Sequence, residues 1–306
     1  MRVLLTGASS GVGLAAARAF ADAGHDLALV ARHPGGLEVA AQIVRGRGRR
    51  AVMLPCDVSD QDAVDAAVAQ AERELGGIDA VVANHAAPVF GPFADVPKRD
   101  FDRCIDVTFL GTVNLLRASL PALERSRGVF VATGSLMTKV PLPTFSSYAA
   151  AKHGLRGFLN SVRVELRAQG SPVRIAMLHP GSIDTPFWRN ATSVTGKQPR
   201  LPPEGYQPYV MAKGLVELAE RPRAEVTIGA EGKLIELLWR WFRPGGDLVL
   251  RAVHHWYMSG RKPASRANAL WEPRGEGWEE TGPMIGRPSL TAPLRWKLRA
   301  PKLLRR

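Results

Sequence analysis

The sequence predicts an α/β fold: a doubly wound parallel β-sheet with helices on both faces, plus a C-terminal helical and irregular extension. Two observations carry this prediction. Short apolar runs rich in Val and Leu alternate with longer segments whose apolar residues recur at helical spacing. The apolar runs also lack polar alternation, as expected for strands buried on both faces. The 45% hydrophobic and 23% charged content is ordinary for a folded globular chain.

The predicted elements follow one another as strand and helix. The strands cover residues 3–6, 27–31, 51–55, 80–83, 128–133 and 173–178. The helices cover residues 12–23, 36–45, 60–74, 98–124 and 146–167. Ser59 precedes the third helix and is its expected N-terminal cap. In an open sheet of this kind, ligands bind at the carboxyl ends of the strands.

The pattern changes after Pro186. Residues 187–208 are rich in Pro, Gly, Thr and Asn, which predicts a long irregular segment or a short-helix lid over a site. A helix at 209–220 and a last strand at 225–229 then complete the sheet. We therefore expect a first domain at residues 1–230.

Residues 231–306 form the predicted extension. Amphipathic pieces at 234–242 and 248–258 are separated by Pro-Gly-Gly at 244–246, and the sequence after Ser259 has little periodicity, which predicts a basic, partly disordered tail. The two pieces carry several aromatic residues with interleaved arginines: Trp239, Trp241, Phe242, Trp256 and Tyr257. We expect these rings to pack on their own protein, with weak contact to a membrane surface as the alternative.

The charge and the cysteines indicate which binding partners and which cellular compartment to expect. The formal charge is +13, and 15 Lys and Arg against 7 Asp and Glu from residue 230 onward place about +8 of it in the last quarter. No nucleic-acid motif accompanies this charge, so we expect a solvated basic surface and no nucleic-acid partner. Cys56 and Cys104 have neither metal-ligand nor disulfide-framework spacing, which favours a reducing cytoplasm and no metal site.

Two further features agree with a cytoplasmic location. The first residues read directly as a strand entering a turn, which leaves no room for the cleavage region of a signal peptide. No apolar stretch reaches the roughly 18 residues that a spanning helix requires.

A glycine-rich turn follows the first strand. Residues 6–13 read Thr-Gly-Ala-Ser-Ser-Gly-Val-Gly and open a helix, a context in which backbone N–H groups and a positive helix end face a pyrophosphate. Gly7 permits the tight turn, Gly11 the approach of phosphate, and Gly13 the close packing of helix on strand. A plain tight turn is the alternative to this predicted dinucleotide site.

The end of the second strand indicates which dinucleotide binds. Residues 29–33 contain no Asp or Glu to bind free ribose hydroxyls, and Arg32 offers a guanidinium in their place. The forked guanidinium suits a 2′-phosphate, and His33 can assist. We therefore expect NADP(H) to be preferred over NAD(H), an exposed loop arginine being the alternative.

Tyr148 and Lys152 are four residues apart in the helix predicted at 146–167, so they share one face. A free phenol titrates near about pH 10, and a nearby ammonium together with a positive nicotinamide would lower its pKa. Ser135 follows the strand at 128–133 and can hold a substrate oxygen. Each feature alone is weak, but their conjunction predicts an acid–base site.

These motifs, taken in order, resemble the short-chain dehydrogenase/reductase superfamily over residues 1–230. The resemblance rests on Thr-Gly-x-x-x-Gly-x-Gly at 6–13, Cys-Asp-Val at 56–58, Ala-Asn-His-Ala at 83–86, Ser135, Tyr148-x-x-x-Lys152 and Pro-Gly-Ser-Ile-Asp-Thr-Pro at 180–186. It implies a Rossmann-type sheet and hydride transfer at nicotinamide C4. Tyr148 would exchange a proton with the substrate oxygen, Ser135 would orient that oxygen, and Lys152 would grip the nicotinamide ribose.

The same resemblance implies the rest of the cofactor site. Asp57 and Val58 would contact adenine, Asn84 and Ala86 the ribose region, and Ile183 and Thr185 the carboxamide. The implied set also includes Ser9, Ser10, Val12, Pro180 and Gly181. Family members commonly form homodimers or homotetramers through the helices that correspond to 98–124 and 146–167, so a homo-oligomer is expected.

Two positions depart from the family pattern. Ala-Asn-His-Ala stands where the family usually has Asn-Asn-Ala-Gly, and Thr108 stands where it has an Asn that holds a proton-relay water. The shorter Thr108 hydroxyl would hold that water in a shifted place, so Thr108 joins the candidate catalytic set. His85 is either a selectivity element or a satisfied buried polar group.

The residues around the candidate catalytic groups predict an apolar substrate pocket. Its expected wall consists of His85, Met137, Leu142, Phe145, Phe187, Trp188 and Phe90. The leading hypothesis is an NADP(H)-dependent oxidoreductase acting on a carbonyl or secondary alcohol. The alternative is a catalytically weak or inactive NADP(H)-binding sensor or assembly subunit, suggested by Thr108, the altered Asn84 region and the basic tail.

Overall fold

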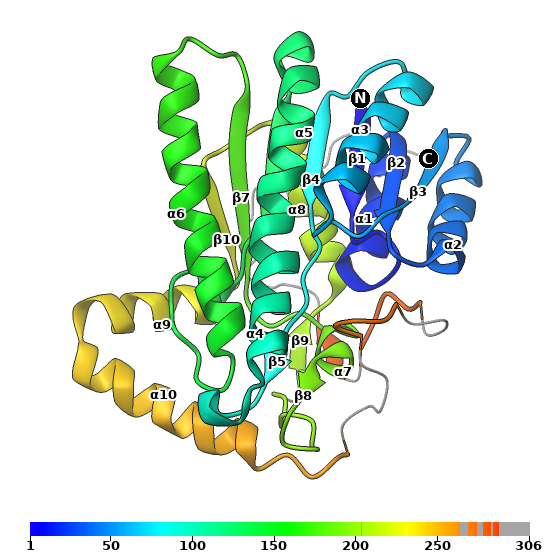
Figure 1. The fold of residues 1–306 in the computed structure, drawn as a ribbon. Coiled ribbons are helices and arrows are strands. Elements are labelled where there is room, and N and C mark those ends of the chain that lie inside the picture. Colours follow the sequence, from blue (N-terminus) through cyan, green and yellow to red (C-terminus); the bar gives the residue numbers. More distant parts are fainter. Residues whose placement is uncertain (203, 264–268, 274–277, 283, 288–306) are drawn as a thin grey trace.

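The computed structural model describes residues 1–202, 204–263, 269–273, 278–282 and 284–287. Its main sheet has seven parallel strands in the order β10-β7-β6-β4-β1-β2-β3 (Figure 1). The strands are β1 (Arg2–Thr6), β2 (Asp26–Ala31), β3 (Ala51–Pro55), β4 (Ala80–Ala83), β6 (Val129–Thr133), β7 (Arg174–Pro180) and β10 (Glu225–Ile228). The predicted doubly wound sheet is confirmed.

The strand order reverses beside β1. The chain winds outward from β1 to β3 and then crosses back to β4 on the other side of β1, so Leu4 pairs with Ala28 on one side and Val81 on the other. Such a switch point opens a crevice at the carboxyl ends of the strands. This edge faces downward in Figure 1, where the irregular segments gather.

Helices cover both faces of the sheet. One face packs against α1 (Gly11–Asp22), α2 (Pro34–Arg45) and α8 (Pro208–Glu220). The other packs against α3 (Gln61–Leu75), α4 (Lys98–Ile105), α5 (Gly111–Ser126) and α6 (Ser146–Ala168). Successive residues of β1 serve the two layers, because Leu4 belongs to one buried cluster and Leu5 to the other.

Two local expectations change in the structure. The helix predicted at 98–124 is divided into α4 and α5 by a π-helical turn at Asp106–Leu110, which contains Thr108. The cap of α3 is Asp60, whose carboxylate accepts from the Ala63 N–H at 3.1 Å. Ser59 was the wrong choice because its hydroxyl donates to Asp57 at 2.8 Å.

The segment after β7 lies over the carboxyl edge, as predicted. In the residues of this segment that the structure describes, the regular elements are the short helix α7 (Phe187–Asn190) and the short strands β8 (Thr192–Ser193) and β9 (Glu204–Tyr206). β8 pairs with β5 (Val89–Phe90), which ties this segment to the chain after β4. Two 3₁₀ turns, Phe93–Asp95 and Leu136–Thr138, complete the connections.

Helices α9 (Ala230–Trp241) and α10 (Arg243–Met258) form a hairpin beside the sheet (Figure 1). The break falls at Phe242, not at 244–246, because proline is tolerated in the first turn of a helix and α10 starts before it. Tyr257 is buried, as expected, but Trp241 is 74% and Phe242 57% exposed. The expectation that the aromatic residues pack on their own protein is therefore wrong for these two.

The chain returns to the carboxyl edge after α10. We call its described residues 269–273, 278–282 and 284–287 the C-terminal strap. It ends in β11 (Ile285–Arg287), which pairs in parallel with β9. The tail after Ser259 was predicted to be partly disordered, and its residues 264–268, 274–277, 283 and 288–306 lie outside the described residues. Among the helices that the structure describes, none combines the length and apolar character needed to span a bilayer.

Candidate active site

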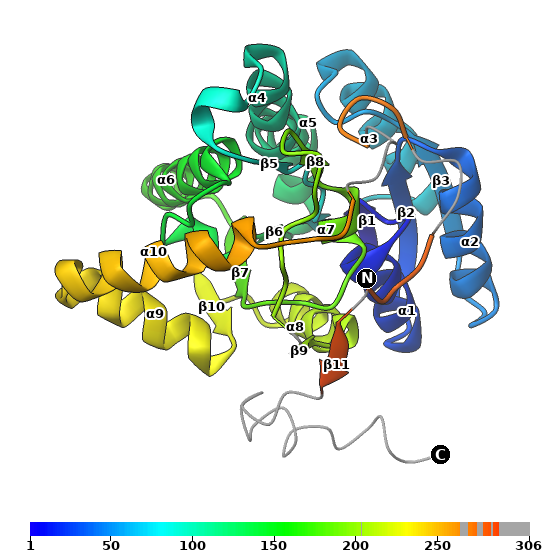
Figure 2. The same cartoon turned by 90° about the horizontal axis from the view of Figure 1, so that it is seen from below.

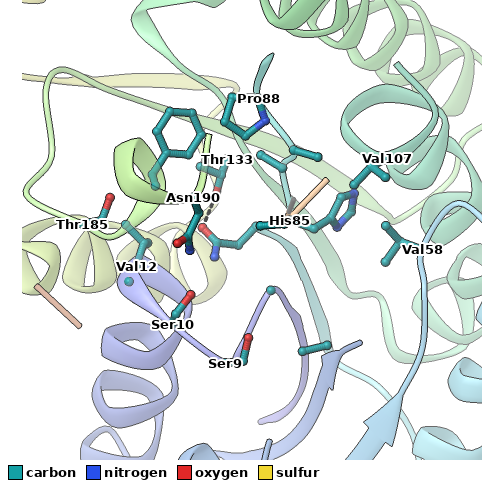
Figure 3. Close-up of a pocket in the computed structure, with 18 of the residues that line it drawn as sticks. Ser9, Ser10, Val12, Val58, His85, Pro88, Val107, Thr133, Thr185 and Asn190 are labelled. Atoms are coloured by element: carbon teal, nitrogen blue, oxygen red, sulfur yellow. Dashed lines mark hydrogen bonds between the residues drawn. The ribbon is translucent and has the colours of Figure 1, made fainter. Parts of the chain in front are cut away.

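A cavity of about 310 Å³ lies at the switch point of the sheet (Figure 3). One end is lined by Arg32 and His33 after β2, and we call it the Arg32 end. The other is lined by Ser135, Tyr148 and Lys152, and we call it the Tyr148 end. The residues predicted to act as acid and base and the residues predicted to bind the 2′-phosphate thus border one continuous cavity.

The glycine-rich turn forms the floor between these ends. Gly7 and Gly11 have positive φ angles of 64° and 55°, a backbone region that favours glycine. A Cβ on Gly13 would lie 1.8 Å from the Gly7 carbonyl oxygen, so only glycine lets α1 pack this closely. Ser9, Ser10 and Val12 line the cavity near the start of α1 (Figure 3), whereas Gly13 shapes the turn from behind.

The Tyr148 end is built from the start of α6 and the loop after β6. Lys152 is fully enclosed, and its Nζ donates to the Thr133 carbonyl at 2.7 Å and lies 5.5 Å from the Tyr148 ring centre. Ser135 caps the 3₁₀ turn that follows β6. These backbone anchors fix Lys152 and Ser135, and α6 carries Tyr148 one turn before Lys152.

Burial controls the protonation of this end. It lowers the pKa of Lys152 to about 8. Burial and the neighbouring Cys104 raise the pKa of Tyr148, while a hydrogen bond with Ser135 acts in the opposite direction. The net shift of the Tyr148 pKa is therefore upward, whereas a lowering by Lys152 together with a positive nicotinamide was expected, and desolvation of the phenolate is its largest cause.

Asn84 and His85 lie at the end of β4. Asn84 lines the cavity, and its Oδ1 accepts from the Thr133 hydroxyl at 3.0 Å (Figure 3). The two ring nitrogens of His85 lie 2.7 Å from the Thr6 hydroxyl and 3.1 Å from the Thr112 hydroxyl. Burial lowers the pKa of His85 to about 3, so the ring is neutral. His85 touches the cavity but fits a satisfied buried polar group.

Thr108 lies behind the cavity wall. Its side chain is buried, and its hydroxyl accepts from the Ala87 N–H at 3.1 Å. This bond anchors the loop that carries Asn84, His85 and Ala86, of which all three line the cavity. Thr108 therefore positions the loop and does not itself border the cavity.

The predicted substrate wall is brought together only in part. Met137, Phe187 and Trp188 line the cavity, and the rings of Phe187 and Tyr148 lie 5.5 Å apart. The structure does not bring Leu142, Phe145 or Phe90 to the cavity surface. Phe145 is 0% exposed and packs in a second layer, 5.3 Å from Phe90 and 5.7 Å from Trp188.

The loop after β7 closes the remaining side. Pro180, Gly181, Ile183 and Thr185 line the cavity, as the family resemblance implies, and Val58 lines it from the loop after β3. Thr185 lies close to the glycine-rich turn, since a Cβ on Gly11 would be 3.2 Å from its Cβ.

The Arg32 end contains residues that the sequence did not reveal. Ala269, Leu270, Pro273 and Trp278 of the strap line the cavity. Arg32 donates to the carbonyl groups of Ala269 at 2.5 Å and Leu270 at 3.1 Å. These contacts join residues more than 200 positions apart and leave no periodic or motif signal.

Asp57 lies beside this end and pairs with Arg103 of α4. Burial would raise the pKa of Asp57, but hydrogen bonds from Arg103 and Ser59 outweigh it and hold the pKa below its usual value. The carboxylate is therefore charged and close to Arg32. Among the described residues, no group of three His, Cys, Asp or Glu side chains is placed to hold a metal ion.

Comparisons with known proteins place this geometry in a family. The family model that describes short chain dehydrogenases matches residues 1–195 of this chain. The uncharacterized oxidoreductase YxnA of Bacillus subtilis (strain 168) is 31% identical over 92% of this chain and 80% of that protein. A hydroxysteroid 11-beta-dehydrogenase 1-like protein of Xenopus tropicalis is 37% identical over 60% of this chain and 65% of that protein.

Comparison with solved structures leads to the same family. The alcohol dehydrogenase of the archaeon Thermococcus sibiricus, complexed with 5-hydroxy-NADP, has a TM-score of 0.63 and 27% identity, covering 74% of this chain and 94% of its own. A metagenomic short-chain oxidoreductase in complex with NADP has a TM-score of 0.62 and 28% identity, covering 74% and 96%. This chain belongs to the short-chain dehydrogenase family and is an oxidoreductase of that type.

Proposed function

We propose that this protein transfers a hydride between NADP(H) and the carbonyl or secondary alcohol of an apolar substrate. One observation carries the proposal: Ser135, Tyr148 and Lys152 converge at one end of a cavity whose other end presents Arg32. The NADP complexes of two structural relatives support the choice of cofactor.

The residues present fit such a cofactor. Gly7, Gly11 and Gly13 form a cradle that any side chain would fill, and α1 directs its amino-terminal end toward it. Ser9, Ser10 and Val12 would hold the pyrophosphate there. When bound, the cofactor supplies or accepts the hydride.

Further contacts follow from the lining of the cavity. Arg32 would bind the 2′-phosphate, while Asp57 and Val58 flank the adenine. Asn84, Ala86 and Lys152 would hold the nicotinamide ribose. Pro180, Gly181, Ile183 and Thr185 would contact the nicotinamide from the β7 side.

The protein's own acid–base step centres on the Tyr148 hydroxyl. A buried phenol with a raised pKa is protonated and can donate to a substrate carbonyl oxygen that Ser135 orients. Since the pKa of Lys152 is about 8, its ammonium predominates near neutral pH and stabilises the phenolate as the proton leaves. Phe187, Trp188 and Met137 form the apolar wall, which selects an apolar substrate.

The test is turnover by matched tyrosine variants. We expect NADPH oxidation with a panel of apolar ketones and aldehydes, and a loss of about 10²–10⁴-fold in Tyr148→Phe. Tyr257→Phe is the control, because Tyr257 is also buried but packs against Phe145 and Trp188, away from the cavity lining. Full activity of Tyr148→Phe on any turned-over substrate would refute the assigned role.

The alternative, a cofactor-binding sensor or assembly subunit, draws on one observation. The Thr108 hydroxyl accepts from the Ala87 N–H and does not border the cavity, so it does not take the place of the family's relay Asn at the cavity surface. This alternative predicts NADPH binding without turnover across the panel. Turnover by Thr108→Asn would identify Thr108 as the cause of the inactivity, and continued absence of turnover in Thr108→Asn would assign Thr108 to positioning alone.

We also propose weak contact of the α9–α10 hairpin with a membrane surface. Leu234, Leu237 and Trp241 form one exposed stripe on α9, Phe242 extends it, and Arg240 and Arg243 flank it. Sedimentation with anionic vesicles should be salt-sensitive and should weaken in Trp241→Ala. Absence of binding at low salt would exclude this contact.

The proposal extends to assembly and location. We propose a homodimer or homotetramer through α4, α5 and α6, to be tested by light scattering. Leu110, in the π-helical turn between α4 and α5, and Val164 of α6 are exposed apolar residues on these helices. The free, buried Cys56 and Cys104 support a cytoplasmic location.

A further inference from the structure

The C-terminal strap crosses the Arg32 end of the cavity. Figure 2, which looks onto the carboxyl edge, shows the described parts of the strap as a coloured segment near α3, a second one beside α1, and β11. The strap therefore lies over the edge where the family binds its cofactor. What it contacts there determines whether it supports the site or occupies it.

The first part of the strap is anchored on α4. The Trp271 indole N–H donates to Asp100 at 2.7 Å, and its ring lies 5.4 Å from the Arg103 guanidinium. Leu270 is buried next to it, and its carbonyl also accepts from Arg103 at 3.3 Å. Leu270, Asp100 and Arg103 are buried, whereas Trp271 is 43% exposed, so this part is docked through buried Leu270 and through hydrogen bonds to buried groups of α4.

The docked chain uses the donors assigned to the cofactor. Arg32, the expected partner of the 2′-phosphate, donates to carbonyl oxygens of Ala269, Leu270 and Trp271. The Gly11 N–H, at the point where phosphate would approach the turn, donates to the Glu279 carbonyl at 2.7 Å. A carbonyl oxygen and a phosphate oxygen cannot occupy the same position on one N–H group.

Trp278 fills space at the same end. Its ring lies 5.3 Å from the His33 ring, and a Cβ on Gly35 would lie 2.4 Å from it. A Cβ on Gly36 would meet both Trp278 at 3.0 Å and Ser9 at 2.6 Å. Trp278 thus packs on the start of α2 between residues that would surround the adenosine ribose.

The strap also presents carboxylates to arginines, as an anionic ligand would. Glu280 pairs with Arg18 of α1 at 2.5 Å, and Glu279 pairs with Arg189 of α7 at 3.2 Å. The strap therefore brings negative charge and carbonyl oxygens to the edge that is lined with Arg32 and the start of α1.

We propose that the C-terminal strap is an autoinhibitory segment that competes with the adenosine 2′-phosphate half of NADP(H) for Arg32 and the Gly11 N–H. This inference rests on the proposed NADP(H) function. The cofactor binds only after the strap is released, so the apparent affinity is reduced by the fraction of molecules in which the strap is open. The strap also packs on the backbone of Thr185, since a Cβ on Gly282 would lie 2.3 Å from the Thr185 carbonyl oxygen. Its residues that line the cavity, however, are those described at the Arg32 end: Ala269, Leu270, Pro273 and Trp278.

The test compares full-length variants. Trp271→Ala removes the anchor on α4 without altering a residue that lines the cavity. We expect it to bind 2′,5′-ADP about tenfold more tightly than the wild-type chain in calorimetry, with binding of reduced nicotinamide riboside, which carries no phosphate, unchanged. Trp241→Ala, an exposed tryptophan on α9, is the matched control and should leave both affinities unchanged.

A second measurement uses the wild-type chain. Saturation with NADPH should increase hydrogen exchange of the Met284 N–H, which the strap conformation bonds to Asp184 at 2.9 Å. Decreased exchange, or weaker 2′,5′-ADP binding by Trp271→Ala, would show that the strap closes over bound cofactor and would overturn the proposal. Equal affinities of wild type and Trp271→Ala would overturn it too.

The outcomes separate this inference from the proposed function. If wild type and Trp271→Ala both bind NADPH with equal affinity, the competition is refuted while the NADP(H) function stands. If neither chain binds NADPH or 2′,5′-ADP, the NADP(H) function fails, and the competition fails with it.

Discussion

The two ends of the cavity are built differently. The Tyr148 end consists of β6, α6 and the loops beside them, with Lys152 fully enclosed and bonded to the backbone of the sheet edge. The Arg32 end is completed by a strap from beyond residue 268, held by Arg32, Arg103 and Asp100. The difference suggests that chemistry is organised by the core, whereas access of the cofactor is controlled by a distant part of the chain.

The largest expected effect concerns the turn that joins the two ends. Gly13→Ala places a Cβ 1.8 Å from a backbone oxygen, so α1 must shift from β1. We expect the free energy of unfolding to fall by about 3 kcal/mol and NADPH binding to be lost. Gly157→Ala in α6 is the control: nothing lies within 4 Å of its Cβ position, and a gain of about 0.5–1 kcal/mol is expected. Urea unfolding measures both.

The second prediction compares a core leucine with a strap leucine of equal burial. Leu159 and Leu270 are each 1% exposed. Leu159→Ala should cost about 3 kcal/mol, because it leaves a cavity beneath α6. Leu270→Ala should cost less than about 1 kcal/mol in global unfolding, because the strap opens locally before the core does.

Urea denaturation of both leucine variants measures this contrast. Equal losses would mean that the strap unfolds together with the core and would erase the distinction between the two ends. A larger loss for Leu270→Ala would reverse it.

The third and smallest effect is electrostatic and belongs to the Tyr148 end. The pKa of Lys152 is lowered from 10.5 to about 8, so the unfolded chain binds more protons between these values and stability rises with pH there. Near neutral pH Lys152 is protonated in the folded and the unfolded chain, so the folded protein carries the full free-energy cost of burying the ammonium. Lys152→Met should therefore be more stable than wild type by about 1 kcal/mol, after loss of the bond to Thr133, while losing activity.

Urea unfolding at neutral pH and at about pH 9.5 checks the sign of this effect. The advantage of Lys152→Met should shrink at the higher pH, as wild-type Lys152 loses its proton. An advantage that stays constant, or a less stable variant at neutral pH, would contradict the lowered pKa.

Local patterns explain which parts of the structure were predictable. The apolar runs and helical periods gave element boundaries close to those observed, because each element buries a face along its own length. Gly7, Gly11 and Gly13 were assigned correctly to a tight turn since their role depends on neighbouring residues. The joint presence of Ser135, Tyr148 and Lys152 in one cavity also follows from local spacing on known elements.

The remaining features depend on distant contacts. The position of Phe145 near Tyr148 in the sequence predicts that it lines the pocket. In the structure Phe90, Trp188 and Tyr257 from other segments pack around Phe145 and separate it from the cavity. The Tyr148 pKa was expected to fall, yet burial, which a sequence does not display, raises it. The strap carries no periodicity, and Arg32 and Arg103 hold it partly through backbone carbonyl groups, which any sequence possesses.

The most direct test of the account is a titration of the purified protein with NADPH and with NADH, alongside Arg32→Ala. Arg45→Ala, an exposed arginine at the far end of α2, is the control. Because Arg32 also holds the strap, the ratio of the two affinities is the quantity to measure. We predict at least a tenfold preference for NADPH, about 1.4 kcal/mol, that Arg32→Ala abolishes. Absence of binding by either nucleotide, or a preference that survives Arg32→Ala, would contradict the account.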